Sequence, residues 1–334
     1  MKSRGVSVTT LLFTIHASNR LGTKGYNDTL RYIIKRLLGM IPTLFIVITL
    51  VFFFVRMIPG DPARLVAGEQ ATAEDVAQVR QDLGLDQPIT VQYGKYVSGL
   101  LKGDLGTSLR SKRPVAQDIG ERYINTLRLT ALSILWSVLI GILLGVWAGA
   151  HRNKWQDYLG MTLSVSGISL PSFWVGFLLI MLFSVKLRWF PTTGAAGFKS
   201  LVLPSITLGI SISAVIARFT RSSIVEILEE DFIRTARAKG LKEKVVIWKH
   251  ALRNSLIQII TVAGLQFGFL LGGSVVTETV FAFPGIGSLL VQSVNFRDYP
   301  EIQSLILIFS LQCILINLLV DILYAVVNPE IKLG

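Results

Sequence analysis

The stretch LTALSILWSVLIGILLGVWAGA, residues 129–150, carries no charged side chain. A helix needs roughly 20 mostly apolar residues to cross about 30 Å of hydrocarbon, so this stretch is long enough to span a bilayer. Five more charge-free windows of similar length follow the same pattern: Leu37–Val55, Tyr158–Val185, Ser200–Ala217, Asn254–Thr277 and Ile302–Val320. The sequence therefore predicts an all-α polytopic membrane protein with about six transmembrane helices. Pro204, near the start of its window, predicts an irregular beginning for that span.

The composition of the chain supports the same class. Of its 334 residues, 51% are hydrophobic and only 16% are charged, and the mean hydropathy is +0.57. The formal net charge of +12 does not indicate a nucleic-acid partner, because much of the Lys and Arg lies beside or between the apolar windows. The single cysteine, Cys313, excludes an intramolecular disulfide framework.

The distribution of basic residues predicts the orientation in the membrane, since cytoplasmic loops retain positive charge. Three basic clusters flank the windows: Arg31, Lys35 and Arg36; Arg152 and Lys154; and nine Lys or Arg residues between Arg218 and Arg253. The connection Glu278–Glu301 carries only Arg297 and suits the outer face. We therefore expect both termini to be cytoplasmic.

These windows divide the chain into five parts. We expect a disordered N-terminal extension at residues 1–30, a first transmembrane helix at 31–57, an extracytoplasmic helical cap at 58–122, a transmembrane core at 123–325 and a cytoplasmic tail at 326–334.

The expected cap contains two helical patterns. Thr72 followed by Asp75 predicts a helix start, and Gly84 can end that helix. A second amphipathic stretch has an apolar side made of Val91, Tyr96, Val97, Leu100 and Leu101. Either the cap only packs on the ends of the spans, or it docks a substrate-delivering protein or lines the outer mouth.

The basic segment DFIRTARAKGLKEKVVIWKHALRN, residues 231–254, lies between two apolar windows. Apolar or small residues recur at helical spacing and predict one packed face: Ile224, Leu228, Phe232 and Ala236. Ala236 and Ala238 are short enough to permit close approach by a partner, and Gly240 can adopt the positive φ of a tight turn.

A second helix is expected at Lys242–Arg253, where Val245, Val246 and Trp248 have basic residues on either side and the helix could lie at the membrane interface. The sequence of residues 231–254 thus predicts a helix, a turn and a second helix, with a solvated positive-inside loop as the alternative.

Between the last two windows, FAFPGIG at 281–287 predicts a tight turn anchored by aromatics or a short re-entrant piece beside a pathway.

Several motifs together resemble a known family. The segment 231–254, GDPA at 60–63, RFTRSS at 218–223, FAFPGIG at 281–287 and RDYP at 297–300 resemble the peptide and nickel importer permeases of ABC transporters. The resemblance covers nearly everything from Tyr32 to Lys332 and is closest to the first of the two permease types, which includes dipeptide, oligopeptide and glutathione subunits.

The resemblance implies that residues 231–254 form the element that couples to an ATPase. In the superfamily this element has a Glu-Ala-Ala pattern, then a glycine and a later Leu-Pro. Here the three positions of the Glu-Ala-Ala pattern are Arg234, Thr235 and Ala236. Gly240 is the glycine, and Leu252 is followed by Arg253 in place of the proline. The implied coupling residues are Phe232, Arg234, Thr235, Ala236, Arg237, Ala238, Lys239, Gly240 and Leu241.

The expected energy source lies outside this chain. A phosphate-binding loop needs G-x-x-x-x-G-K-[ST], and the only Gly-Lys pair, Gly94 and Lys95, is followed by Tyr96. ATP and Mg are expected in partner subunits, with no cofactor here. The family resemblance implies three kinds of partner: a second homologous permease, two ABC ATPase subunits and an extracytoplasmic substrate-binding protein. It also implies a multi-pass protein in contact with the lipid of a bacterial inner membrane.

Other chemistry finds little support in the sequence. The three histidines, His16, His151 and His250, are scattered, so no metal site is expected, and no catalytic motif converges on one place. This argues against a membrane-embedded enzyme.

The resemblance implies import of short peptides, namely a dipeptide, an oligopeptide or glutathione. Nickel import and an ATP-independent carrier remain as alternatives.

Overall fold

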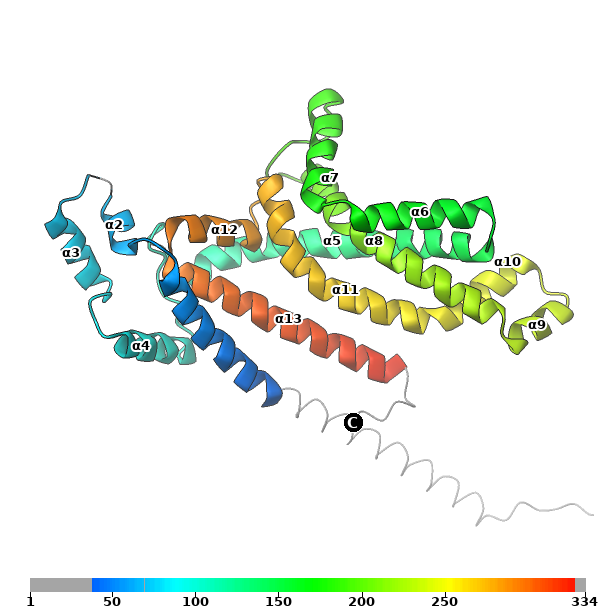
Figure 1. The fold of residues 1–334 in the computed structure, drawn as a ribbon, viewed down its shortest axis with the longest axis horizontal. Helices are drawn as coiled ribbons and strands as arrows, with labels where there is room; N and C mark the ends of the chain where they lie inside the picture. Colours follow the sequence, from blue (N-terminus) through cyan, green and yellow to red (C-terminus); the bar gives the residue numbers. More distant parts are fainter. Residues whose placement is uncertain (1–37, 69, 328–334) are drawn as a thin grey trace, which may run out of the picture.

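The computed structural model describes residues 38–68 and 70–327, and within them it is helical apart from turns, loops and one isolated bridge between Thr107 and Pro114. The helices form an elongated bundle (Figure 1). The predicted N-terminal extension, much of the predicted C-terminal tail and the start of the first helix lie outside the described residues. The all-α polytopic fold predicted from the sequence is confirmed for the described part.

Three short helices form the cap at one end of the molecule: α2 (Pro62–Ala67), α3 (Ala73–Asp82) and α4 (Ile89–Leu101). The predicted start of α3 is confirmed, because Thr72 Oγ1 accepts the Asp75 N–H at 3.2 Å while the Asp75 carboxylate accepts the Thr72 N–H at 2.9 Å. Gly84 ends this helix region with a φ of +65°.

Within the described residues, four helices are long and apolar enough to cross a membrane: Leu38–Met57, α5 (Val115–Ala150), α8 (Lys199–Leu228) and Tyr299–Val320 of α13 (Tyr299–Val327). Two bent pairs bring the number to six if each counts as one span. The first pair is α6 (Trp155–Ser169) with Ser172–Lys186, which comprises α7 (Ser172–Leu179) and η1 (Ile180–Lys186). The second is Gln258–Leu270 with Ser274–Val280, both within α11 (Leu252–Val280). α5 begins before residue 123, where the sequence placed the start of the core.

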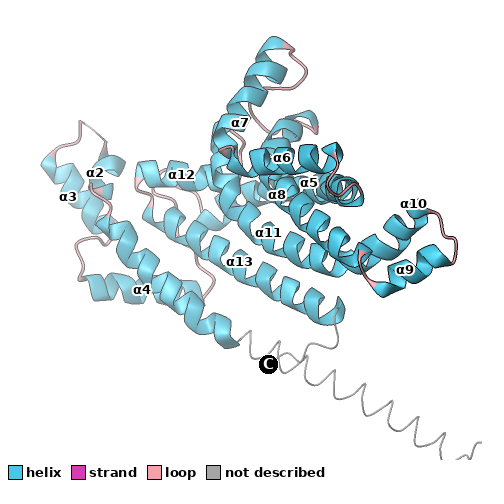
Figure 2. Ribbon diagram, turned by 45° about the vertical axis from the view of Figure 1, so that its right-hand side comes forward, coloured by secondary structure: helices cyan, strands magenta, loops and turns pink. Residues whose placement is uncertain are grey.

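The window Tyr158–Val185 was expected to be one span, and the structure bends it by 102°. The break lies at Leu170 and Pro171, which have extended backbone angles. A proline disfavours helical geometry in the residue before it, so α6 ends there and α7 starts in a new direction. The arm made by α7 rises away from the bundle in Figures 1 and 2.

The expected irregular start at Pro204 was wrong. α8 begins at Lys199 and continues through Pro204. Pro204 is the sixth residue of α8, so it removes one hydrogen bond, the one that an N–H at this position would donate to the Ser200 carbonyl, and the helix continues on both sides. α8 therefore spans 30 residues, longer than its apolar window suggested.

The most extensive contact between described helices is that of α5 with α8. Gly141, Gly145 and Gly149 recur every fourth residue of α5, and a Cβ built on Gly145 would stand 2.6 Å from the Ala217 carbonyl oxygen of α8. Such small-residue spacing lets two backbones approach closely. Ser137 Oγ donates to the Gly209 carbonyl at 2.8 Å, which joins the same two helices by a hydrogen bond.

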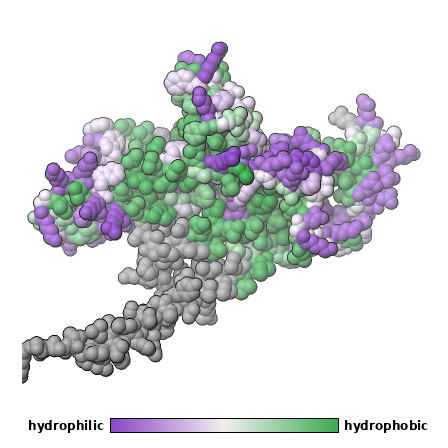
Figure 3. All heavy atoms as spheres, turned by 180° about the vertical axis from the view of Figure 1, so that it is seen from behind, coloured by the Kyte–Doolittle hydropathy of each residue, from purple (hydrophilic) through white to green (hydrophobic). Residues whose placement is uncertain are grey.

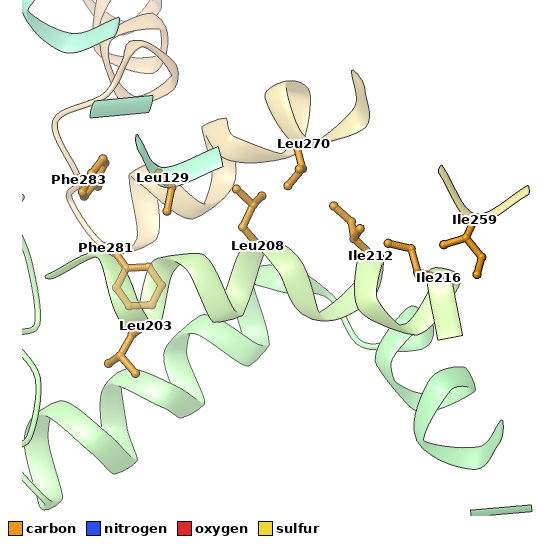
Figure 4. Close-up of a cluster of buried hydrophobic side chains, with 9 residues drawn as sticks. All are labelled: Leu129, Leu203, Leu208, Ile212, Ile216, Ile259, Leu270, Phe281 and Phe283. Carbon is orange, nitrogen blue, oxygen red and sulfur yellow. The ribbon is translucent and has the colours of Figure 1, made fainter. Parts of the chain in front are cut away.

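The largest apolar core cluster lies along α8 from Leu203 to Ile216. Its fully or nearly buried side chains, seen in Figure 4, are Leu129, Leu203, Leu208, Ile212, Ile216, Ile259, Leu270, Phe281 and Phe283. They come from α5, α8, α11 and the loop after α11, so α8 is the element around which the others assemble.

Hydropathy divides the surface along the long axis. Hydrophobic residues cover much of the middle of the molecule, and hydrophilic residues gather at its two ends and at the tip of the projecting arm (Figure 3). Many large apolar side chains of the spans are exposed, including Phe45, Leu135 and Leu319. Such a large exposed apolar surface is expected of a protein solvated by lipid.

Candidate functional site

The segment singled out in the sequence forms a helical hairpin at the end of the molecule opposite the cap (Figure 1). It consists of α9 (Asp231–Ala238), α10 (Glu243–Val245) and a π-helical turn η2 (Val246–Ala251) that leads into α11. The helix–turn–helix prediction is confirmed, and the solvated-loop alternative is wrong.

α9 is a separate helix and not a continuation of α8. α8 ends at Leu228, and Glu230 caps α9 with an extended backbone, ψ 150°. The helical spacing read from Ile224 to Ala236 therefore runs across a break. Its predicted packing face is correct for Ile224 and Ala236 but wrong for Phe232, which is 43% exposed.

The inward face of α9 consists of Ile233 and Ala236. Both are buried in an apolar cluster with Val146 of α5, Ile224 of α8, and Val246 and Ala251 of η2. The expectation that Ala236 leaves room for an outside partner is corrected, because Ala236 packs inside the chain. This cluster fastens α9 to the ends of two long helices.

The outward face carries the remaining predicted coupling residues. Arg234, Thr235, Ala238 and Lys239 are exposed, and so are two large apolar side chains, Phe232 and Leu241, the latter at 39%. Thr235 Oγ1 is occupied locally, since it donates to the Asp231 carbonyl at 3.0 Å. The nine predicted residues therefore divide between an inner anchor and an outer surface.

The turn after α9 depends on Gly240, whose φ is +77°. The Gly240 N–H donates to the Arg237 carbonyl at 2.9 Å, and the Leu241 N–H donates to the Ala236 carbonyl at 3.4 Å. This pair of bonds is the Schellman motif, which needs a left-handed residue after the helix end. The predicted role of Gly240 as the turn residue is confirmed.

An ion pair closes the same turn. The Arg237 guanidinium donates to the two carboxylate oxygens of Glu243 at 2.7 and 3.1 Å. These hydrogen bonds hold the pKa of Glu243 below its usual value and raise the pKa of Arg237. A second pair, Arg152 with Glu229, joins the loop after α5 to the end of α8.

The second helix of the hairpin also presents two faces. Val246 and Ala251 are buried, whereas Val245 and Trp248 are exposed, the latter at 44%. The second helix predicted at Lys242–Arg253 is thus confirmed, and its place at a membrane interface stays a prediction. Together with Phe232 and Leu241, these side chains give the hairpin an exposed apolar surface amid basic residues.

A second constellation, at the opposite end of the bundle, was missed in the sequence. Glu278 near the end of α11 is fully buried; its carboxylate accepts from Thr126 Oγ1 at 2.7 Å and from the Ser288 N–H at 2.9 Å. Ser288 lies in the first turn of α12 (Ile286–Phe296), so Glu278 caps that helix from another element. A lone acid at the end of an apolar window, just before a glycine-rich loop, was the available signal.

The FAFPGIG stretch links these two helices. Phe281 and Phe283 are buried in the core, Thr126 Oγ1 accepts the Ile286 N–H at 2.9 Å, and α12 follows as a short apolar helix. The tight turn anchored by aromatics is confirmed, and it continues into this short helix.

Family models match both parts of the chain. Residues 141–333 match the model of the binding-protein-dependent transport system inner membrane component, and residues 29–130 match the N-terminal model of the same transport system membrane component. Together they cover the hairpin, the cap and the spans.

Individual relatives agree with these models. The chain is 57% identical over 303 residues to the glutathione transport system permease protein GsiC of Salmonella typhimurium strain LT2, covering 91% of this chain and 99% of the relative. It shows the same identity and coverage with GsiC of Escherichia coli strain K12.

Solved structures share the fold. An inward-facing MetNI methionine ABC transporter matches with a TM-score of 0.55 and 19% identity, over 64% of this chain and 97% of that chain. An amino acid ABC transporter with histidines matches with a TM-score of 0.50 and 17% identity, over 63% and 94% of the two chains. The predicted resemblance is therefore confirmed: the chain belongs to the binding-protein-dependent transport system inner membrane components, the non-catalytic, multi-pass permease subunits of ABC importers in the bacterial inner membrane.

Proposed function

We propose that this chain is the permease subunit of an ATP-driven importer of glutathione and related short peptides. The names of its relatives at 57% identity support the substrate, since they are glutathione transport permeases. A second, homologous permease would complete the pathway, and an extracytoplasmic protein would deliver the substrate. No observation favours nickel import or an ATP-independent carrier.

The two faces of α9 carry the proposal. Ile233 is buried against the ends of α5 and α8, while the preceding residue, Phe232, is 43% exposed on the outward face of α9. An exposed aromatic on a helix that is itself firmly packed is a suitable anchor for a groove on another protein. We assign that groove to an ABC ATPase subunit in the cytoplasm, which also places both termini there.

The buried cluster supplies the transmission. ATP and Mg would bind in two partner ATPase subunits, and closure of those subunits would displace α9. Since Ile233 and Ala236 pack on Val146 and Ile224, a displacement of α9 moves the ends of α5 and α8 with it. The close packing of α5 on α8 would then carry the movement through the membrane as a rigid unit.

The test uses a strain in which this gene is deleted and then restored. Phe232→Asp is expected to abolish uptake of labelled glutathione and to lose the ATPase from the purified assembly, while the amount of permease in the membrane stays unchanged. Phe198→Asp is the matched control, because Phe198 is an exposed phenylalanine just before α8, at its opposite end. It should retain the ATPase. Normal uptake and ATPase retention by Phe232→Asp would overturn the proposed contact. Uptake of labelled nickel, with no uptake of labelled glutathione or dipeptide, would overturn the proposed substrate.

A further inference from the structure

A cavity of about 420 Å³ lies between the cap and the bundle. Its walls come from the end of α3, the start of α4, the end of the first helix and the first turn of α13, with Arg56, Gln87, Lys95, Tyr299 and Gln303 among the lining residues. Small-molecule sites occupy cavities of about 300–1,000 Å³. The cap helices that line the cavity lie at the opposite end of the molecule from the α9 hairpin (Figure 1).

Two polar side chains in this wall have a buried atom without a hydrogen-bond partner among the described residues. Gln303 is 4% exposed and its Nε2 has no acceptor, and the buried Gln87 Oε1 has no donor. Buried polar groups in native proteins are almost always bonded, because an unmade bond costs the desolvation of the group. One free donor and one free acceptor in the same wall match the C=O and the N–H of a peptide group.

The charges of the wall indicate a carboxylate. Arg56 donates to Gln92 Oε1 at 3.0 and 3.2 Å and to the Phe52 carbonyl at 3.1 Å, which uses three of its five N–H groups. Neither Arg56 nor Lys95 forms an ion pair with another described residue. Asp82 is the only acidic residue in the wall. A wall with two cations and one acidic residue is complementary in charge to a ligand that carries one ammonium group and more than one carboxylate.

The Arg56 guanidinium is also held in place by its neighbours. The Arg56 guanidinium lies 3.5 Å from the centre of the Phe52 ring, and the hydrogen bonds to Gln92 connect it to α4. A guanidinium held on both sides loses little entropy when a carboxylate binds to its remaining N–H groups. Tyr299 and Pro300 provide an apolar wall beside these polar groups.

We propose that this cavity, hereafter the cap pocket, is a binding site for a short acidic peptide on the permease itself. Gln303 Nε2 would donate to a peptide carbonyl, Gln87 Oε1 would accept a peptide N–H, and Arg56 and Lys95 would hold a carboxylate. The cap pocket requires no contact between α9 and an ATPase, so binding to it is measured without ATP and without a delivering protein.

Glutathione is the first probe, measured by equilibrium binding to the permease assembly in nanodiscs. The wild-type assembly should bind it saturably. Gln303→Leu should weaken binding at least about tenfold, the cost of one lost bond to a charged or buried group. Because Gln303 Nε2 bonds to no described residue, this variant should melt at or above the temperature of the wild type. Gln117→Leu, at an exposed glutamine of α5 outside the pocket, is the matched control and should bind normally.

A second pair of variants tests the charge. Lys95→Glu reverses one charge in the wall and should weaken binding about tenfold or more, whereas Lys102→Glu, on the same cap but outside the pocket, should not. A probe with both carboxylates converted to amides should bind more weakly than glutathione. Equal affinity of wild type and Gln303→Leu would overturn the proposal, because it would show that the bound peptide makes no hydrogen bond to Gln303. Displacement only by an anionic phospholipid, and not by glutathione, would overturn it too.

Discussion

Arg237 and Glu243 face each other across the Gly240 turn, joined by two hydrogen bonds of 2.7 and 3.1 Å. Both side chains are about half exposed, at 43% and 55%, so an ion pair of this kind contributes only about 0.5 kcal/mol. The backbone angle of Gly240 is therefore the main determinant of the turn, and the ion pair refines it.

Replacing Gly240 tests the turn directly. A proline fixes φ near −65°, far from the observed +77°, and removes the N–H that donates to the Arg237 carbonyl. A side chain itself would meet no atom within 4 Å, so Gly240→Asn, which tolerates positive φ, is the matched control. Gly240→Pro should abolish uptake with insertion intact, and Gly240→Asn should keep most of it. Uptake assays with immunoblots of the membrane fraction measure both, and normal transport by Gly240→Pro would contradict the assigned role.

The ion pair predicts a small dependence on pH. Since the pKa of Glu243 is held below 4.5 in the folded turn, the pair stabilises the turn fully above that pH and loses its effect as the pH falls through the lowered pKa. Glu243→Gln removes the effect at every pH. Hydrogen exchange of residues 239–241 should be about twofold faster in this variant at neutral pH. The two proteins should converge in acid, and a difference that persists there would show another cause.

The buried Glu278 predicts a graded series. Its two carboxylate oxygens accept from Thr126 Oγ1 and from the Ser288 N–H. Glu278→Gln keeps the shape but only one acceptor oxygen, whereas Glu278→Ala removes the acceptor of every donor around the carboxylate, Gly287 and Ser274 included, at a cost of about 3 kcal/mol or more. The melting temperature in detergent should fall in the order wild type, Gln, Ala. Equal losses for the two variants would mean that the charge, and not the cap on α12, stabilises this end.

The sequence was sufficient for the parts of the fold that depend on local patterns. Charge-free windows located the spans, the Thr72–Asp75 pair located the start of α3, and Gly240 located the turn after α9. Each is a property of neighbouring residues, so each can be read without knowing what lies next to it in space. The 102° bend at Pro171 had a local signal too, but the long apolar window masked it.

What depends on distant contacts was not predictable in this way. Helical spacing assigned Phe232 to a packed face, but the break at Glu230 rotates α9 so that Ile233 is buried in its place. Ala236 is short because it packs on the chain itself, and its size alone could not distinguish that from an outside partner. The cap pocket depends on side chains from four elements that meet only in the folded protein.

The glycines of α5 give the last prediction. Gly120 and Gly145 lie in the same helix, yet a Cβ on Gly120 would meet nothing within 4 Å, while one on Gly145 would stand 2.6 Å from the Ala217 carbonyl oxygen and 2.5 Å from Thr220 Cβ.

Gly120→Ala should therefore stabilise the protein by about 0.5–1 kcal/mol, because alanine loses less entropy in a helix. Gly145→Ala should instead force α5 and α8 apart and cost about 1–3 kcal/mol. Melting temperatures in detergent separate the two effects, and uptake should fall only for Gly145→Ala, since α9 is fastened to both helices. If the two variants shift the melting temperature in the same direction, the close approach of α5 and α8 does not hold the bundle together.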